Sequence, residues 1–156
     1  MNSYDFVIVG GGVIGLSLAL NLKKKFPDLS VLIIEKEKTL AFHASGRNSG
    51  VLHAGFYYTS DSLKAKFTRE GNATIRQYCQ DKKIQVNNCG KLVDCKNEAD
   101  LLGLDELEKR AKHNSVELYR ISEKEAKSIE PRVITMENAL WSPTTCSVDP
   151  IQVMDS

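Results

Sequence analysis

Three glycines near the N-terminus have the types and spacing that a phosphate-binding loop requires. Gly10, Gly12 and Gly15 form the pattern G-x-G-x-x-G directly after a short apolar run. Gly10 permits a tight turn, Gly12 lets the main chain approach a pyrophosphate, and Gly15 lets a helix pack closely on the preceding strand. The amide groups of Val13 and Ile14, at the start of that helix, would face the phosphate anion.

Two apolar strands and a helix are expected to position this loop. Residues 6–9 and 31–34 are apolar on both faces, which is typical of central strands in a parallel sheet. Between them, an apolar helical pattern begins at Val13 and ends at three lysines. Glu35 follows the second strand, about 20 residues after the last glycine, where a carboxylate can accept hydrogen bonds from an adenosine ribose. This strand–helix–strand unit predicts dinucleotide binding.

Two other interpretations of this segment fit the residues less well. The uncharged stretch from Phe6 to Leu22 could pass for a signal-peptide core or a membrane anchor. It is, however, shorter than the roughly 20 residues that a membrane span needs, and Asp5 stands where a signal peptide carries a basic residue. The other alternative is a glycine-rich turn without a ligand. We expect a ligand-binding unit and no transmembrane segment.

Composition favours a globular protein with a small-molecule ligand. The chain of 156 residues is 42% hydrophobic and 26% charged, with a net charge of +1 and interspersed acids and bases. This balance provides no electrostatic basis for binding nucleic acid. Its cysteines form no CxxC pair and no metal-ligand spacing, so we expect buried thiols in a reducing cytosol and no metal site. They are Cys79, Cys89, Cys95 and Cys146.

A second segment, from Ala44 to Tyr58, is rich in glycine, alanine and serine. Such residues let the main chain run close to a large flat ligand, and their hydroxyl and amide groups can bind phosphate oxygens or a polar ring edge. An ordinary polar loop is the alternative. The position directly after a dinucleotide-binding unit favours a second contact with the same ligand.

Together, the sequences GGGVIG, EK and ASGRNSGVLHAGFYY resemble the FAD-dependent amino-acid oxidase-like family. Within it, the form S-G-x-N-S-G-x-x-H-x-G-x-Y-Y is most similar to the L-2-hydroxyglutarate oxidase or dehydrogenase branch. The resemblance covers essentially the whole chain. It implies FAD as the cofactor and an α/β fold, with a partial Rossmann-type FAD/NAD(P)-binding domain and the start of an antiparallel α+β substrate domain.

The resemblance also implies which residues bind the cofactor. The glycine loop would cradle the pyrophosphate, the acid of the EK pair would hold the adenosine ribose, and the second segment would follow the pyrophosphate and ribityl chain. The cofactor-binding residues are, in that order, Gly10, Gly12, Val13, Ile14, Gly15, Glu35, Lys36, Ser45, Arg47, Asn48 and Ser49.

By the same resemblance, His53 would lie beside the isoalloxazine ring and near the substrate. A histidine suits a catalytic base there, because its unperturbed pKa is close to neutral and it can accept a hydroxyl proton as hydride leaves the carbon. A structural hydrogen-bond donor and a covalent flavin tether are the alternatives. Tyr57 and Tyr58 would either bind a substrate carboxylate or serve as packing residues.

The rest of the chain alternates helices with short strands. The helix expected over 61–83 has an apolar face, Leu63, Phe67, Gly71, Ile75, Tyr78 and Cys79, on which the glycine indicates close approach to a neighbour. The other expected elements are a hairpin or sheet strand over 84–96, a helix over 98–113, a strand over 116–121, a capping box at Ser122–Glu125 opening a helix that ends at Pro131, a strand over 139–141 and a helix beginning at Ile151.

We expect three parts: residues 1–83 as the N-terminal part of the FAD-binding domain, 84–148 as part of the substrate domain, and 149–156 as the start of a returning helix. Two double-sided strands with one crossover helix leave apolar faces and edges without partners. Family members are also considerably longer, so we expect the chain to be an incomplete fragment.

The predicted function is FAD-dependent oxidation of a small 2-hydroxy acid, L-2-hydroxyglutarate, to 2-oxoglutarate, with oxygen or a quinone as the electron acceptor. The expected location is the cytoplasm or the periphery of a membrane at its inner face. Oxidation of an amino acid or of glycerol 3-phosphate by the same fold is one alternative, and an inactive truncated remnant is another. The SGRNSG segment argues against a dehydrogenase that uses only a nicotinamide.

Overall fold

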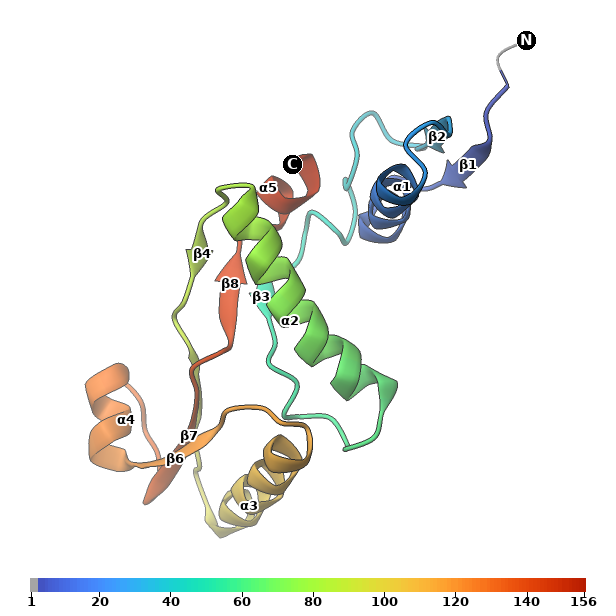
Figure 1. Ribbon diagram of the computed structural model, residues 1–156. Helices are drawn as coiled ribbons and strands as arrows, with labels where there is room; N and C mark the ends of the chain where they lie inside the picture. The colour runs from blue at the N-terminus through green and yellow to red at the C-terminus, as the bar shows by residue number, and fades with distance from the viewer. Residues whose placement is uncertain (1–2) are drawn as a thin grey trace. The chain divides into compact units, whose positions relative to one another are not determined.

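The contacts of the chain divide it into two compact units in the computed structural model, which describes residues 3–156 (Figure 1). The first unit comprises the residues up to Gly50 together with Asp149–Ser156, and the second comprises Val51–Val148. The division falls at Gly50, whereas the predicted boundary lay at residue 83, because helix α2 (Leu63–Asp81) packs with strands of the second unit. The domain functions assigned to these ranges remain predictions.

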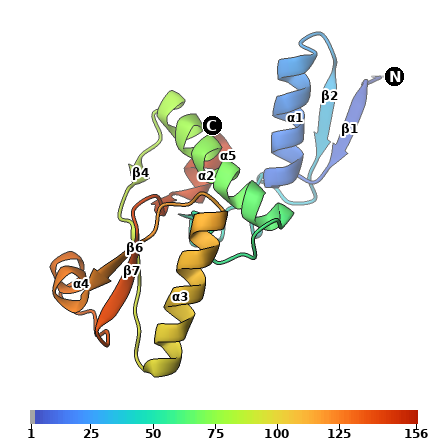
Figure 2. The ribbon, with the colours of Figure 1, turned by 60° about the horizontal axis from the view of Figure 1, so that its bottom comes forward.

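The first unit contains the predicted strand–helix–strand arrangement. Its elements are β1 (Phe6–Val9), α1 (Val13–Lys25), β2 (Val31–Ile34) and α5 (Pro150–Asp155). β1 and β2 are parallel, in register from Phe6 opposite Val31 to Val9 opposite Ile34, and α1 lies beside them (Figure 2). Ser30 donates its amide to the Asp5 carboxylate at 2.7 Å, which holds the two strand starts together. The parallel pairing that the apolar runs predicted is confirmed.

Much of the apolar surface of the first unit is exposed. In β1 only Ile8 is buried, at 8% exposure, whereas Val9 is 84% exposed, and Ile14 of α1 is 81% exposed. The prediction that one crossover helix leaves apolar faces of these strands without partners is therefore confirmed within the described residues, because a two-stranded sheet with one such helix covers only part of its surface.

The second unit is built on two antiparallel sheets. The strand orders are β3-β8-β4 and β5-β7-β6. Its elements are β3 (Val51–Leu52), α2, β4 (Val86–Asn87), β5 (Lys91–Val93), α3 (Glu98–His113), β6 (Tyr119–Ser122), α4 (Glu123–Ile129), β7 (Asn138–Ser142) and β8 (Cys146–Val148).

Residues 84–96 were predicted to form a hairpin or a sheet strand; the hairpin is wrong, and the segment forms sheet strands instead. β4 pairs with β8 and β5 pairs with β7, so the two strands belong to different sheets. Gly90, between them, has a φ of +65° and lies so close to the Trp141 indole that a Cβ atom would overlap the ring. This turn sends the chain from one sheet to the other instead of folding it back on itself.

Helix α2 buries only part of the face predicted for it. Its buried residues are Ala65, Asn72 and Cys79, of which Cys79 was predicted, whereas Leu63 and Phe67 are exposed. The prediction of close approach at Gly71 is wrong, because a Cβ built there meets no atom within 4 Å. Asn72, which lies outside the predicted face, is held inward because its amide donates to the Leu52 carbonyl at 2.8 Å and to the Thr144 carbonyl at 3.1 Å.

The later helices follow their predictions closely. α3 spans Glu98–His113 as expected and buries Leu104 and Ala111. α4 opens with the predicted capping box, in which the Ser122 hydroxyl accepts the Glu125 amide and the Glu125 carboxylate accepts the Ser122 amide. β6 starts at Tyr119, three residues after the predicted start.

The cysteine side chains differ in their accessibility. All four cysteines are free; Cys79, Cys95 and Cys146 are buried and Cys89 is exposed.

Across residues 3–156, no helix combines the length and the apolar character needed to cross a membrane.

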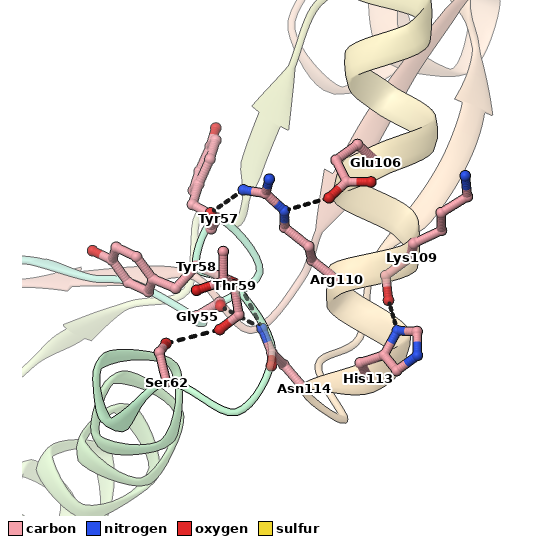
Figure 3. A network of polar contacts seen from close by, with 10 residues as sticks. All are labelled: Gly55, Tyr57, Tyr58, Thr59, Ser62, Glu106, Lys109, Arg110, His113 and Asn114. Carbon is pink, nitrogen blue, oxygen red and sulfur yellow. Dashed lines mark hydrogen bonds and ion pairs between the residues drawn. The ribbon is translucent and has the colours of Figure 1, made fainter.

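A network of polar contacts fixes the segment after β3 against the end of α3 (Figure 3). Asn114, 6% exposed, donates its side-chain amide to the carbonyls of Gly55, at 3.2 Å, and Tyr58, at 2.9 Å. Its own carbonyl accepts a hydrogen bond from the Arg69 guanidinium at 2.8 Å. Since buried carbonyls need donors, this asparagine determines the course of residues 55–58.

Replacing Asn114 with alanine should destabilise the second unit. Asn114→Ala leaves the Gly55 and Tyr58 carbonyls without their donor, which should lower the free energy of unfolding by about 2 kcal/mol. Urea unfolding followed by circular dichroism measures this loss. Asn88→Ala, at an exposed asparagine, is the control and should stay within about 0.5 kcal/mol of the wild type. Equal stability of the two variants would contradict the conclusion that Asn114 determines the course of residues 55–58.

Candidate functional site

The glycine loop between β1 and α1 has the geometry that its sequence predicts. Gly10 has a φ of +106°, which a residue with a Cβ rarely adopts. A Cβ at Gly15 would collide with the Gly10 carbonyl oxygen and lie 3.2 Å from Ile8, so α1 meets β1 through a glycine contact. A Cβ at Gly12 would lie 3.0 Å from the Ser45 hydroxyl. The tight turn at Gly10 and the close packing at Gly15 are thus present, while ligand binding by these glycines remains a prediction.

The start of α1 offers free amide groups to an anion. Its N-cap, Gly12, contributes no side-chain hydrogen bond, and the Val13 amide donates to the Ser45 hydroxyl at 3.0 Å. Within residues 3–156, the amides of Ile14 and Gly15 have no acceptor. Unpaired amides at the positive end of a helix dipole form an anion-binding site, so the residues present fit a pyrophosphate.

Glu35 ties the end of β2 to this loop. Its two carboxylate oxygens accept the Gly11 amide, at 2.7 Å, and the Glu37 amide, at 3.0 Å. These hydrogen bonds, that from Glu37 first and that from Gly11 second, lower the pKa of Glu35 below its usual value. An ionised carboxylate has about four lone-pair positions, so two remain that could accept the hydroxyls of a ribose.

A cavity of about 350 Å³ lies in the first unit beside these groups. This volume is within the range of about 300–1,000 Å³ for small-molecule sites. The cavity brings together Gly10, Gly12, Glu35, Lys36 and Ser45 of the predicted residues.

Phe42 and His43 also line this cavity, although neither is among the predicted site residues. The His43 imidazole contacts the Glu37 carboxylate at 2.8 Å. The Arg47 guanidinium lies 4.3 Å from the centre of the Phe42 ring. The aromatic pair immediately before the small-residue segment was the signal in the sequence that could have identified this wall.

The remaining predicted residues of the first unit mainly shape their own loop. Asn48 donates its side-chain amide to the Ala44 and Ser45 carbonyls, at 3.0 and 2.9 Å, and accepts the Gly50 amide at 2.8 Å. Ser49 is exposed. Asn48 therefore holds Ser45 in place beside the glycine loop, and direct contacts of Asn48 and Ser49 with a cofactor remain predictions.

His53 belongs to the second unit and not to the unit that holds the glycine loop. Its side chain is exposed, but partial burial of the ring, and secondarily the charge of Lys91, lower its pKa below the usual 6.5. The neutral imidazole is therefore the prevailing form at neutral pH, as a proton acceptor requires. Its position beside a cofactor remains a prediction.

A larger cavity, of about 680 Å³, lies in the second unit along α2. Its lining mixes polar and apolar side chains and includes Arg69, Arg76 and Gln77. Volume alone would favour this cavity as a binding site. The smaller cavity is lined by Gly10 and Gly12 of the glycine loop and by the ionised acid Glu35, so we take it as the candidate cofactor site. Within residues 3–156, no cluster of metal-ligating side chains is present.

Comparison with known proteins agrees with this geometry. A family model described as FAD dependent oxidoreductase matches residues 5–156. The chain belongs to this family. The predicted resemblance is thereby confirmed, and so is the predicted cofactor, FAD, for the family to which the chain belongs.

Individual relatives cover most of this chain but only part of their own length. The chain is 42% identical over 151 residues to the mitochondrial L-2-hydroxyglutarate dehydrogenase of Nematostella vectensis, covering 96% of this chain and 33% of the relative. It is 44% identical over 131 residues to that of Pongo abelii, covering 83% and 31%. The chain thus spans about a third of the length of these curated relatives.

A solved structure with FAD bound has a similar fold. It is L-alpha-glycerophosphate oxidase from Mycoplasma pneumoniae, with a TM-score of 0.87 and 28% sequence identity, covering 99% of this chain and 41% of that one. The mixed α/β architecture of this chain is therefore that of the FAD-dependent oxidoreductases.

The close contact at Gly15 can be tested with a second helical glycine as control. Gly15→Ala forces the new methyl group into the Gly10 carbonyl, which should lower the free energy of unfolding by about 1–3 kcal/mol. Gly71→Ala places its methyl group in open space and should raise that free energy by about 0.5–1 kcal/mol. Urea unfolding of both variants measures the difference. Similar effects of the two substitutions would contradict close packing at Gly15.

Proposed function

We propose that this protein takes part in the FAD-dependent oxidation of L-2-hydroxyglutarate to 2-oxoglutarate. The observation that carries the proposal is the identity of 42–44% with L-2-hydroxyglutarate dehydrogenases over most of the chain. The anion-binding helix start and the ionised Glu35 in one unit support it, since both are needed to hold a dinucleotide. FAD would supply the hydride acceptor.

In this proposal the first unit is the beginning of a Rossmann-type cofactor domain. The unpaired amides of Ile14 and Gly15 would bind the pyrophosphate. The Val13 amide would join them by exchanging the Ser45 hydroxyl for a phosphate oxygen. The free lone pairs of Glu35 would accept the ribose hydroxyls. The neighbouring positions Lys36, Arg47, Asn48 and Ser49 would complete the wall along the cofactor.

His53 would act as the base. Its imidazole would accept the proton of the substrate hydroxyl while hydride leaves the same carbon. The lowered pKa of His53 supports this role, because the ring is ready to accept a proton at neutral pH. The antiparallel sheets of the second unit would form part of the substrate domain.

The chain is shorter than the proteins that it resembles. Because the chain spans about a third of its relatives, we infer that residues 3–156 supply only part of the complete catalytic unit. The electron acceptor would be oxygen or a quinone, and the site of action would be the cytoplasm or the inner face of a membrane.

Oxidation of glycerol 3-phosphate is a second candidate function, supported by the fold shared with the Mycoplasma pneumoniae oxidase.

Flavin binding followed by reduction tests the proposed function. The chain incubated with FAD and freed of excess should show a flavin spectrum, and L-2-hydroxyglutarate should bleach it while the D enantiomer and glycerol 3-phosphate should not. His53→Gln should retain the bound flavin and slow its reduction about 10²–10⁴-fold, the usual contribution of a general base. A chain that binds no FAD, or flavin reduced only by glycerol 3-phosphate, would contradict the proposal.

The pH dependence of reduction should reflect the lowered pKa of His53. The rate should follow the fraction of unprotonated His53 and fall to half of its maximum at the pKa of His53, which lies below 6.5. Stopped-flow reduction of the bound flavin between pH 5 and 8 measures this profile (about the range in which histidines titrate). A half-maximal rate at a pH above 6.5 would contradict the assignment of His53 as the base.

A further inference from the structure

A half-buried lysine, Lys91, lies next to the segment that carries His53 and Tyr57. The Lys91 ammonium nitrogen is 4.4 Å from the centre of the Tyr57 ring, and the charge of Lys91 acts on the His53 imidazole. All three residues belong to the second unit. The contact between Lys91 and Tyr57 therefore lies within one compact body.

Tyr57 is held firmly in this arrangement. Its ring packs on Phe56, with the ring centres 4.4 Å apart, and Phe56 is 1% exposed. The Tyr57 carbonyl accepts a hydrogen bond from the Arg110 guanidinium at 2.9 Å, and Arg110 is fixed in turn by Glu106 at 2.8 Å (Figure 3). The aromatic face below the ammonium group is thus anchored to the core and to α3.

Lys91 is also presented by a rigid element. It is the first residue of β5 and lies opposite Ser142 of the central strand β7. The preceding residue, Gly90, packs against the Trp141 indole in a conformation that favours glycine. The backbone of Lys91 is therefore fixed by the packed turn before it and by the pairing of its own strand with β7.

The Lys91 ammonium has no counter-ion in the described part of the chain. Within residues 3–156, no carboxylate oxygen lies within the 4.0 Å that defines an ion pair with its nitrogen, whereas Arg110 and Arg120 of the same unit each contact carboxylates. A half-buried charge without a partner is costly, and an anion that pairs with it recovers that cost. The site thus favours an anionic ligand.

We propose that Lys91 binds a carboxylate of the substrate, with the Tyr57 ring fixing the ammonium group and His53 beside it to receive the proton of the substrate hydroxyl. This inference rests on the proposed function and adds the residue that recognises the substrate as an acid and not as an uncharged alcohol. Lys91 is then the residue that selects for the acid, and His53 is the residue that acts on the alcohol.

Glutarate, which carries the two carboxylates without the hydroxyl, is a suitable probe for the flavin-free chain. The chain has three histidines, His43, His53 and His113, whose ring signals can be followed by NMR as a function of pH, and His53→Gln assigns the signal of interest. Glutarate should raise the pKa of His53, because its carboxylate neutralises Lys91. The ring signals of the other two histidines should show no such response to glutarate. Neither 1,5-pentanediol nor inorganic phosphate should produce the response at His53.

Variants of Lys91 separate its charge from its packing. Lys91→Met should raise the pKa of His53 without ligand, abolish the response to glutarate and weaken glutarate binding by roughly tenfold or more. Lys91→Arg should retain the response, because the positive charge remains. Lys64→Met is the matched control, since Lys64 lies 4.5 Å from the Tyr58 ring in a similar contact, and it should respond to glutarate like the wild type.

The inference is overturned if glutarate shifts His53 equally in the wild type and in Lys91→Met, or if only phosphate shifts it. These measurements need no flavin, so a failure of the proposed function is seen separately, as a chain that binds no FAD. Conversely, flavin that L-2-hydroxyglutarate reduces equally well in Lys91→Met would overturn the role of Lys91 alone.

Discussion

The contact between α1 and β1 through Gly15 is the constraint on which the cofactor site depends. Because no Cβ separates the helix start from the Gly10 carbonyl, the helix begins directly above the strand end. This position leaves the Ile14 and Gly15 amides unpaired and lets Ser45 reach the Val13 amide at 3.0 Å. Anion binding thus follows from a packing distance between two backbone segments.

The first unit was largely predictable from its sequence because its signals are local. The apolar runs, the glycine spacing and Glu35 lie within 31 residues of one another, counting from Asp5. Each of these residue types by itself predicts the local structure that it forms. Phe42 and His43 could not be placed in the same way, because what brings them to the cavity is the turn at residues 36–44 and not a periodic pattern. The amide of Gly11 was likewise not expected to be paired with Glu35.

The second unit was less predictable because its pairing is non-local. β8 pairs with both β3 and β4, which lie far apart along the chain, and no turn signal marks that choice. Asn72 changed part of the expected inward face of α2 by donating to two distant carbonyls, although Cys79 of that face is buried as predicted. By contrast, α3 and the Ser122 capping box, whose interactions span a few residues, were predicted closely. Lys91 reaches the Tyr57 ring through these distant pairings, so only the histidine of the proposed site could be singled out in advance.

The distribution of the thiols has a practical consequence for spectroscopy. Burial raises the pKa of the Cys79 and Cys146 thiols and encloses Cys95, whereas Cys89 is exposed. An alkylating fluorophore used at neutral pH would therefore modify Cys89 selectively, since the thiolate is the reactive form. Cys89 lies on the turn that joins the two sheets, immediately before Gly90, so the native chain already carries a single labelling position from which ligand-dependent changes at this turn can be observed.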